Sequence, residues 1–176
     1  LSYCNAWACT PRPAPRHYHS MTRFDLPSIL MPEHMALHAQ RHPEKAALVF
    51  NDIVLSWGAF DRQQNQIANA LRARGVGRGD KVGILADNSN DAVVAYFGTL
   101  KSGAAVASLP TIVTTDSLVT MIADCGATLL IVSDAFLDRI DLIRDRVNVD
   151  ADAYISIGSS PVGWQELGAW RNAASD

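Results

Sequence analysis

The chain has 176 residues, of which 48% are apolar and 19% are charged, and its formal net charge is −3 at pH 7. This length is typical of a single domain, and the apolar content excludes a wholly disordered chain. The lack of a basic excess argues against nucleic acid as a partner, and no uncharged apolar run reaches the roughly 18 residues of a transmembrane segment.

The first twenty residues have a composition unlike the rest of the chain. They contain Cys4 and Cys9, three of the eight prolines and no acidic residue. Their proline-rich stretch, residues 11–15, favours extended and solvated chain, and Met21 opens a segment that resembles an ordinary start. We interpret residues 1–20 as a disordered leader, tag or upstream sequence. A proline-rich ligand for an aromatic groove is the alternative, although the stretch has no P-x-x-P core.

Three cysteines argue against a disulfide scaffold in a chain of this length. Cys125 lies in an apolar helical pattern, which favours an inert core position over a reactive thiol. An odd, sparse count without a Cys-x-x-Cys pair is not typical of a zinc site either. It is usual in the reducing cytoplasm, where we expect the protein to be located.

Short apolar runs predict a β-hairpin at the start of the ordered region. Residues 46–50 and 53–57 are two strand patterns separated by the turn signal Asn51-Asp52. A short helix is predicted before them, over residues 32–41, and Pro43 ends it because proline disfavours helix in the preceding residue.

Strands and helices then alternate along the chain. The predicted strands are nearly continuous apolar runs, as expected for strands covered on both faces, and span residues 81–86, 104–109, 128–132 and 153–157. Helical spacing of apolar residues predicts helices over residues 58–74, from the cap candidates 88–91 to Gly103, from Asp116 to Gly126, and from Asp134 to Val147. Crossovers of this length suit parallel pairing. The pattern predicts a three-layer α/β fold, with a mostly parallel sheet and helices on both faces, preceded by the short hairpin.

The periodic pattern fades after Gly158. Trp164, Leu167 and Trp170 have the spacing of one helical turn, but we expect nothing in this chain to pack on them. We therefore divide the chain after the leader into an α/β N-terminal subdomain, residues 21–158, and a partly ordered tail, residues 159–176, that leads to a missing downstream region.

Polar residues follow the carboxyl end of each predicted strand, where ligands bind in an open α/β sheet. The segments are residues 87–90, 110–115, 133–134 and 158–160. Each segment is also a turn or a helix N-terminus, where Asn, Asp, Ser or Thr side chains accept hydrogen bonds from backbone amides. We interpret these residues as caps rather than ligand contacts.

Two possible sites do not have the residue pattern that their chemistry requires. The glycine run at residues 75–80 leaves a helix and enters a strand, whereas a dinucleotide fingerprint does the reverse. His34, His38 and His42 share one helix face, but no glutamate follows His34, so we expect a surface histidine face rather than a metal site. The sequence has no G-x-x-x-x-G-K-[ST] phosphate loop and no G-x-S-x-G nucleophile elbow. We predict no catalytic, cofactor-binding or metal-binding residue in this chain.

Four short motifs occur in a fixed order between residues 31 and 132. They are Leu55-Ser56-Trp57-Gly58-Ala59-Phe60 with Asn65, residues 68–75 and Gly79-Asp80-Lys81-Val82; Asn88-Ser89; Leu100-Lys101-Ser102-Gly103-Ala104-Ala105-Val106; and Asp124-Cys125-Gly126-Ala127. In order and spacing they resemble the opening and core motifs of the AMP-forming acyl-adenylate synthetases, with the fatty-acid or carnitine-type CoA ligases nearest.

The resemblance implies the N-terminal part of an acyl-CoA synthetase. Such enzymes join a carboxylic or fatty acid to the α-phosphate of ATP, release pyrophosphate and pass the acyl group to the thiol of CoA, while Mg²⁺ neutralises phosphate charge. ATP, Mg²⁺, CoA and a small carboxylic acid would then be partners of a longer parent protein, whose remaining chain is also a partner of this part.

Several parts of the family pattern are missing from this chain. The phosphate-binding Ser/Thr/Gly-rich loop with its lysine, the acidic ribose-binding motif, the adenine-stacking stretch and the catalytic lysine would all lie beyond Asp176. Residues 108–112, Ser-Leu-Pro-Thr-Ile, depart from the family's Pro-Leu-Asn/Asp-Pro, so no CoA contact is carried over. We therefore expect no cofactor and no activity for this chain alone. Gly103 and Lys101 have structural explanations, a positive φ and a charge at a helix C-terminus.

Two alternatives remain at this point. A free-standing flavodoxin-like α/β module, which binds a partner or nucleotide without catalysis, explains the alternation but not the ordered motifs. A splice or frameshift product could instead compete for the partners of the parent protein.

Overall fold

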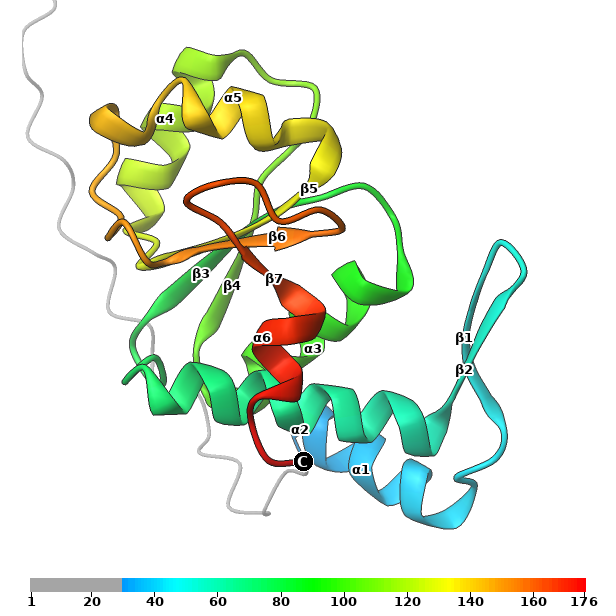
Figure 1. Ribbon diagram of the computed structural model, residues 1–176. Helices are drawn as coiled ribbons and strands as arrows, with labels where there is room; N and C mark the ends of the chain where they lie inside the picture. The colour runs from blue at the N-terminus through cyan, green and yellow to red at the C-terminus, as the bar shows by residue number, and fades with distance from the viewer. Residues whose placement is uncertain (1–29) are drawn as a thin grey trace, which may run out of the picture.

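The computed structural model describes residues 30–176, so the interpretation of residues 1–20 lies outside the described residues. Five parallel strands form the central sheet, in the spatial order β4-β3-β5-β6-β7 (Figure 1). Their bounds are β3 (Lys81–Leu85), β4 (Ala105–Ser108), β5 (Leu129–Ser133), β6 (Tyr154–Ile157) and β7 (Gln165–Glu166). The expected parallel sheet is confirmed.

Helices cover both faces of the sheet, as expected. On one face lie α2 (Trp57–Ala73), α3 (Asn90–Ser102) and α6 (Leu167–Asn172), and α1 (Met31–Arg41) packs beneath α2, on the side away from the sheet. On the other face lie α4 (Thr115–Cys125) and α5 (Leu137–Asp141). The central strand β5 supplies both cores by alternation. Leu129 and Ile131 pack with α2 and α3, whereas Leu130 and Val132 pack with α4 and α5.

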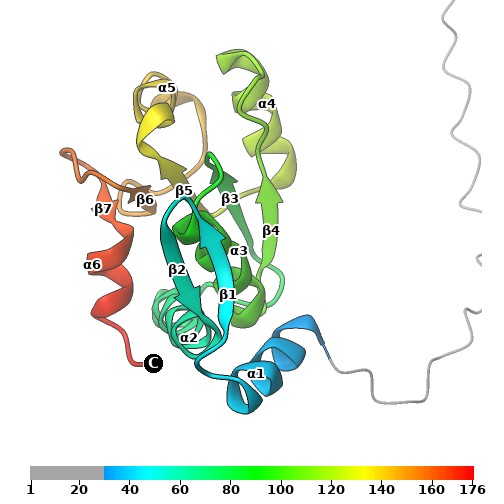
Figure 2. The ribbon, with the colours of Figure 1, turned by 90° about the vertical axis from the view of Figure 1, so that its right-hand side faces the viewer.

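The expected hairpin is also present. β1 (Ala46–Phe50) and β2 (Ile53–Ser56) pair antiparallel as a separate two-stranded sheet. Asn51 has a φ of 51°, which its short polar side chain tolerates in a tight turn. Figure 2 shows the hairpin standing in front of the helical layer that contains α2 and α3.

The helix expected from Asp134 to Val147 is broken into three pieces, so that expectation is wrong. A 3₁₀ turn, η1 (Asp134–Phe136), precedes α5, and a second one, η2 (Arg144–Arg146), follows it. The tighter turns have a physical consequence, because side chains three residues apart lie on one side of a 3₁₀ turn. The amide of Ile143 donates to the carbonyl of Ile140, and both side chains are completely buried.

The expectation that Trp164 and Leu167 lack a packing partner is wrong as well. β7 adds a fifth strand beside β6, which buries Trp164 in the core beneath α5 and Leu167 in the core beneath α2. The guanidinium of Arg144 lies over the rings of Tyr154 and Trp164, at 3.9 and 4.6 Å from their centroids. Local periodicity could not reveal the Arg144 contacts, because Tyr154 and Trp164 lie 10 and 20 residues further along the chain.

α2 and α3 approach each other closely at Gly98. Gly98 faces Ile67 there, and a Cβ added to Gly98 would lie 2.5 Å from the Ile67 Cβ. Because both helices are already held against the sheet, neither can move away without opening the core.

Gly98→Ala should therefore destabilise the domain by about 1–2 kcal/mol despite the better helix propensity of alanine. Chemical denaturation measures the change. Gly77→Ala is the matched control, since its added Cβ would meet nothing nearer than a carbonyl oxygen at 3.8 Å. A Gly98→Ala variant as stable as the control would show that the helices separate easily.

The buried phenol of Tyr154 should make the stability of the domain depend on pH in the alkaline range. Its hydroxyl is buried without a hydrogen-bond partner among residues 30–176, and burial raises the pKa of the phenol. Above pH 10 the unfolded state loses this proton first, so stability should fall as the pH rises from about 10 toward the raised pKa. Tyr154→Phe should leave stability at pH 7 within about 1 kcal/mol and reduce the alkaline loss. Thermal melts of both proteins from pH 7 to pH 11 measure this, and equal alkaline losses would contradict it.

Candidate functional site

The carboxyl ends of β3 and β5 form the topological switch point of the sheet. The strands are neighbours, but α3 leaves β3 for one face while α5, after β5, lies on the other. In open α/β sheets, ligands bind in the crevice at this place. The amide of Asp87 donates to the Ser133 Oγ at 3.3 Å and so joins the two strand ends.

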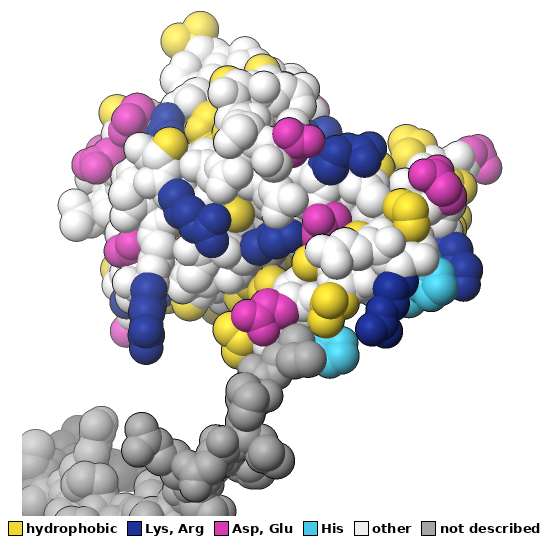
Figure 3. Space-filling model, turned by 90° about the horizontal axis from the view of Figure 1, so that it is seen from below, with side chains coloured by type: hydrophobic (Ala, Val, Ile, Leu, Met, Phe, Trp, Pro, Cys, Tyr) yellow, Lys and Arg dark blue, Asp and Glu magenta, His cyan; other side chains and the backbone are white. Residues whose placement is uncertain are grey.

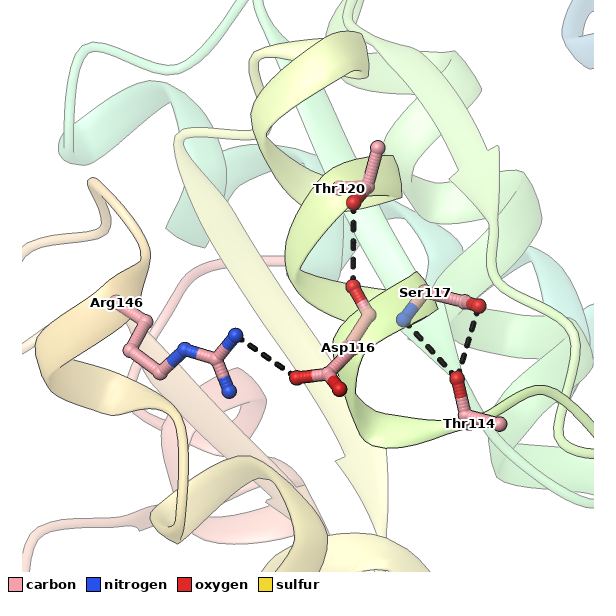
Figure 4. Close-up of polar contacts among 5 residues, drawn as sticks. All are labelled: Thr114, Asp116, Ser117, Thr120 and Arg146. Atoms are coloured by element: carbon pink, nitrogen blue, oxygen red, sulfur yellow. Dashed lines mark hydrogen bonds and ion pairs between the residues drawn. The ribbon is translucent and has the colours of Figure 1, made fainter.

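Two of the polar strand-end segments cap helices, as expected. Ser89 accepts the amide of Ala92 at 3.1 Å at the start of α3. Thr114 accepts the amide of Ser117 at 3.2 Å at the start of α4 (Figure 4). The helix expected from Asp116 begins at Thr115, with Thr114 as its cap, so Asp116 lies in the first turn and its carboxylate pairs with Arg146 at 2.8 Å.

Asp134 holds the loop that follows β6. Its Oδ1 accepts both the amide of Ser159, at 2.8 Å, and its hydroxyl, at 2.7 Å. Gly158, with a φ of 112°, lies so close that an added Cβ would be 2.3 Å from the Asp134 Oδ2. Asp134 is thus a loop anchor and not a helix cap.

Arg139 fixes the loop after β4, a role that the sequence did not suggest. From α5 it donates to the carbonyl oxygens of Thr111, at 2.7 Å, and Val113. A charged group that satisfies two loop carbonyls is among the stronger single hydrogen-bonding arrangements in proteins. The loop it holds carries Ile112, whose side chain is 94% exposed.

A cavity of about 460 Å³ lies beside the carboxyl ends of β3 and β4. Its wall is mainly apolar and includes Val93, Tyr96 and Phe97 of α3, while Asp87 and Asn88 form a polar rim. This size and chemistry are typical of small-molecule sites, so we regard this cavity as the candidate functional site. The sequence indicated the rim but not the aromatic wall, because the rotation of α3 against the sheet decides which of its side chains face the cavity.

A second cavity, of about 370 Å³, lies at the opposite end of the sheet, near Asp80 and Asp152. Two of its charged groups have partners within the fold: Arg74 donates to the Asp152 carbonyl oxygen at 2.6 Å, and Asp80 accepts the amide of Gly77. Ligands rarely bind at the amino ends of such strands, so we do not treat it as the functional site.

The histidine face of α1 contains an aromatic cluster. The rings of His38 and His42 lie 5.0 Å apart, and His38 meets Trp57 edge-on at 4.5 Å. The positive charge of Lys45, then desolvation, then His38 and Arg41 lower the pKa of His42. Within residues 30–176 no three His, Cys, Asp or Glu side chains are close enough together to hold a metal ion.

The motif residues are engaged in packing rather than chemistry. Lys101, at the end of α3, pairs with Asp61 of α2 at 2.6 Å, and both side chains are about four-fifths buried. Gly103 has a φ of 98°, as expected, and Asn69 donates to the Ser175 carbonyl oxygen at 2.8 Å. Figure 3 shows the underside of the domain, which α1 and α2 form. Cys125 is half-buried, and its thiol donates to a carbonyl oxygen of its own helix.

The geometry defines a parallel α/β domain whose candidate site lies at the carboxyl ends of the strands, beside the switch point. Residues 35–169 match the family described as AMP-binding enzyme. Bacitracin synthase 1 of Bacillus licheniformis is 28% identical over 159 residues, which is 82% of this chain and 3% of the relative. The 3-hydroxybenzoate/4-hydroxybenzoate CoA ligase of Thauera aromatica is 35% identical over 99 residues, or 56% of this chain and 19% of the relative.

Solved structures agree with this match. The anthranilate CoA ligase AuaEII in complex with anthranoyl-AMP superposes with a TM-score of 0.73 and 26% identity, over 82% of this chain and 27% of that one. A long-chain-fatty-acid CoA ligase from Rhodopseudomonas palustris has a TM-score of 0.77 at 18% identity, over 84% of this chain and 37% of that one. This likeness supports the fold alone. The chain therefore belongs to the AMP-binding enzyme family. It spans only a small part of the length of these relatives.

Arg139→Met should release the loop after β4. The variant keeps the apolar stem but loses both hydrogen bonds to the loop, so amide exchange at residues 111–114 should accelerate and stability should fall by about 1–3 kcal/mol. Hydrogen exchange with mass spectrometry measures the first effect. Arg146→Met is the control, because its ion pair with Asp116 is exposed and should contribute little. Equal exchange in the two variants would show that Arg139 does not hold the loop.

Proposed function

We propose that this chain is the N-terminal part of an adenylate-forming ligase. Such a protein activates a carboxylic acid with ATP, forming an acyl-adenylate and pyrophosphate, and then transfers the acyl group to a thiol. The observation that carries the proposal is the family match over residues 35–169. A solved relative named as a complex with anthranoyl-AMP supports the same chemistry.

We further propose CoA as the thiol and a carboxylic or fatty acid as the substrate. Support comes from the CoA ligases among the structural neighbours and from one curated relative named as an aromatic-acid CoA ligase. A second candidate is amino-acid activation in a peptide synthase, since several similar sequences are bacitracin, tyrocidine and gramicidin synthases. Pyrophosphate exchange with panels of amino acids and of aromatic and fatty acids, followed by CoA consumption, separates the two.

Of the groups that this chemistry needs, residues 30–176 fit the organic acid but not the magnesium ion. The cavity beside α3 has the size and the apolar wall for a small organic group. In the longer protein, ATP would supply the adenylate and Mg²⁺ would neutralise phosphate charge. Residues 30–176 offer no cluster of three metal ligands, so we assign no magnesium contact to them. Their proposed role is to hold the strand ends and the cavity wall in place.

The flavodoxin-like module is less well supported. In chain order the strands lie 2-1-3-4-5 across the sheet, which is the flavodoxin-like order. That alternative therefore explains the sheet, but it does not explain the family match.

We propose that the protein is located in the cytoplasm, because its few cysteines are typical of a reducing compartment. No helix within residues 30–176 combines the length and apolar character needed to cross a bilayer.

Purified 1–176 should show no ATP–pyrophosphate exchange above a buffer blank. The sequence contains neither the glycine-rich phosphate loop nor the lysine that follows it, so nothing would position the triphosphate. The reading frame past Asp176 is the accompanying measurement, and the proposal expects a Ser/Thr/Gly-rich loop there. The longer polypeptide should then catalyse exchange. Exchange by residues 1–176 alone, or a stop codon directly after Asp176, would contradict the proposal.

A further inference from the structure

The end of α1 places two histidine rings side by side. His38 and His42 are four residues apart, and their ring centroids lie 5.0 Å from each other, with the ring planes tilted by 59°. His38 is exposed and His42 is half-buried, and histidine side chains are open to solvent on the underside of the domain (Figure 3). Neutral imidazole is the commonest metal ligand in proteins, so a shared metal ion is the chemistry that such a pair can supply.

The separation of the two rings is that of imidazoles bound to one ion. A nitrogen ligand lies about 2.0–2.1 Å from the metal, with its ring centre about 1.2 Å behind it, so each centroid would be about 3.2 Å from the ion. At the bond angles of square-planar and tetrahedral sites, about 90–110°, two such centroids are about 4.5–5.2 Å apart. The observed 5.0 Å lies in this range. The second side-chain torsion of histidine is broad, so each ring can turn a nitrogen toward a shared ion while the helix stays in place.

The backbone keeps this spacing although α1 ends here. The His42 amide still donates to the His38 carbonyl oxygen at 2.9 Å, so the cap residue retains the helical register. The His42 carbonyl oxygen accepts the amide of Lys45 at 3.1 Å. On the other side, the His38 ring meets Trp57 of α2 edge-on, with the centroids 4.5 Å apart. Both ligands are therefore held in position before an ion binds, which reduces the entropic cost of binding.

The charges around the pair determine which ions it can bind. The positive charge of Lys45, then desolvation, then His38 and Arg41 lower the pKa of His42, so its ring is neutral at pH 7.5 and able to bind a metal. The same positive charges oppose a cation. Among residues 30–176 no third His, Cys, Asp or Glu side chain completes the site. Mg²⁺ and Ca²⁺, which need oxygen ligands, are therefore unsuitable, whereas imidazole suits Cu²⁺, Ni²⁺ and Zn²⁺.

We propose that His38 and His42 form a surface site for one divalent transition-metal ion, which binds Cu²⁺ more tightly than Ni²⁺ or Zn²⁺. One nitrogen of each ring is a ligand, and water completes the coordination. The bound ion ties the last turn of α1 to the segment that leads into β1. The site shares no residue with the cavity beside α3 and does not depend on the proposed ligase chemistry.

A copper titration of the 176-residue chain tests the proposal. Other histidines and the thiols would compete for copper or reduce it, so the background protein carries His17→Gln, His19→Gln, Cys4→Ser, Cys9→Ser and Cys125→Ser. The three histidines that remain all lie at the end or on the face of α1. Calorimetry with CuCl₂ at pH 7.5 measures the stoichiometry and the Kd, and thermal melts show that each variant is folded.

The background protein should bind one equivalent of Cu²⁺, and MgCl₂ should give no binding heat. His38→Gln and His42→Gln should each weaken binding at least about tenfold, because the second bond of a chelate forms at high effective concentration. His34→Gln is the matched control, since His34 lies on the same helix face but the rings in contact are those of His38 and His42. It should bind as the background does. Lys45→Gln should tighten binding by about threefold, because one opposing charge is removed.

Trp57 provides a readout that a site elsewhere in the chain would not move. Its indole lies against His38, and Cu²⁺ quenches the fluorescence of a nearby indole. Quenching should therefore follow the calorimetric titration and largely disappear in Trp57→Phe, whose Kd should be unchanged. A Kd above about 100 µM, a loss of binding in His34→Gln but not in His42→Gln, or full quenching in Trp57→Phe would overturn the inference.

Discussion

The need to cover a parallel sheet on both faces governs the arrangement of nearly every other element. Successive side chains of a strand point to opposite faces, so a strand such as β5 must supply two apolar sets, and it does so with no polar residue before Ser133. Each set needs its own helical layer. The close contact of Gly98 with Ile67 follows from the same need, because two helices must fit side by side over one face.

This covering also limits what the strand ends can do. The loops that leave the sheet have backbone groups that need partners, and the polar side chains nearby provide them. Ser89 and Thr114 cap helices, Asp134 anchors a loop, and Arg139 satisfies two carbonyl groups of another. The residues that look most like ligand contacts therefore already have structural partners. The cavity beside α3 remains, and its wall is largely apolar, so it suits recognition of an organic group better than acid–base chemistry.

Local pattern predicted the hairpin, the alternation of strands and helices, and the glycine helix ends, because each depends on residues close together in the sequence. The failures share a different cause. The break in the helix after Asp134 and the burial of Trp164 both involve Arg144, whose ring partners lie 10 and 20 residues further on. The Lys101–Asp61 pair joins residues forty apart. For the site, the polar rim could be predicted from strand ends, but the aromatic wall depends on how α3 is rotated against the sheet.

The motifs shared with the family lie in the packing of α2 and α3 rather than at the cavity. Asn69, Lys101 and Gly103 hold helix ends and neighbouring segments together, and Lys101 is paired where it could not reach a ligand without losing Asp61. The resemblance over residues 31–132 thus has a structural cause, and it identifies the fold but not a substrate.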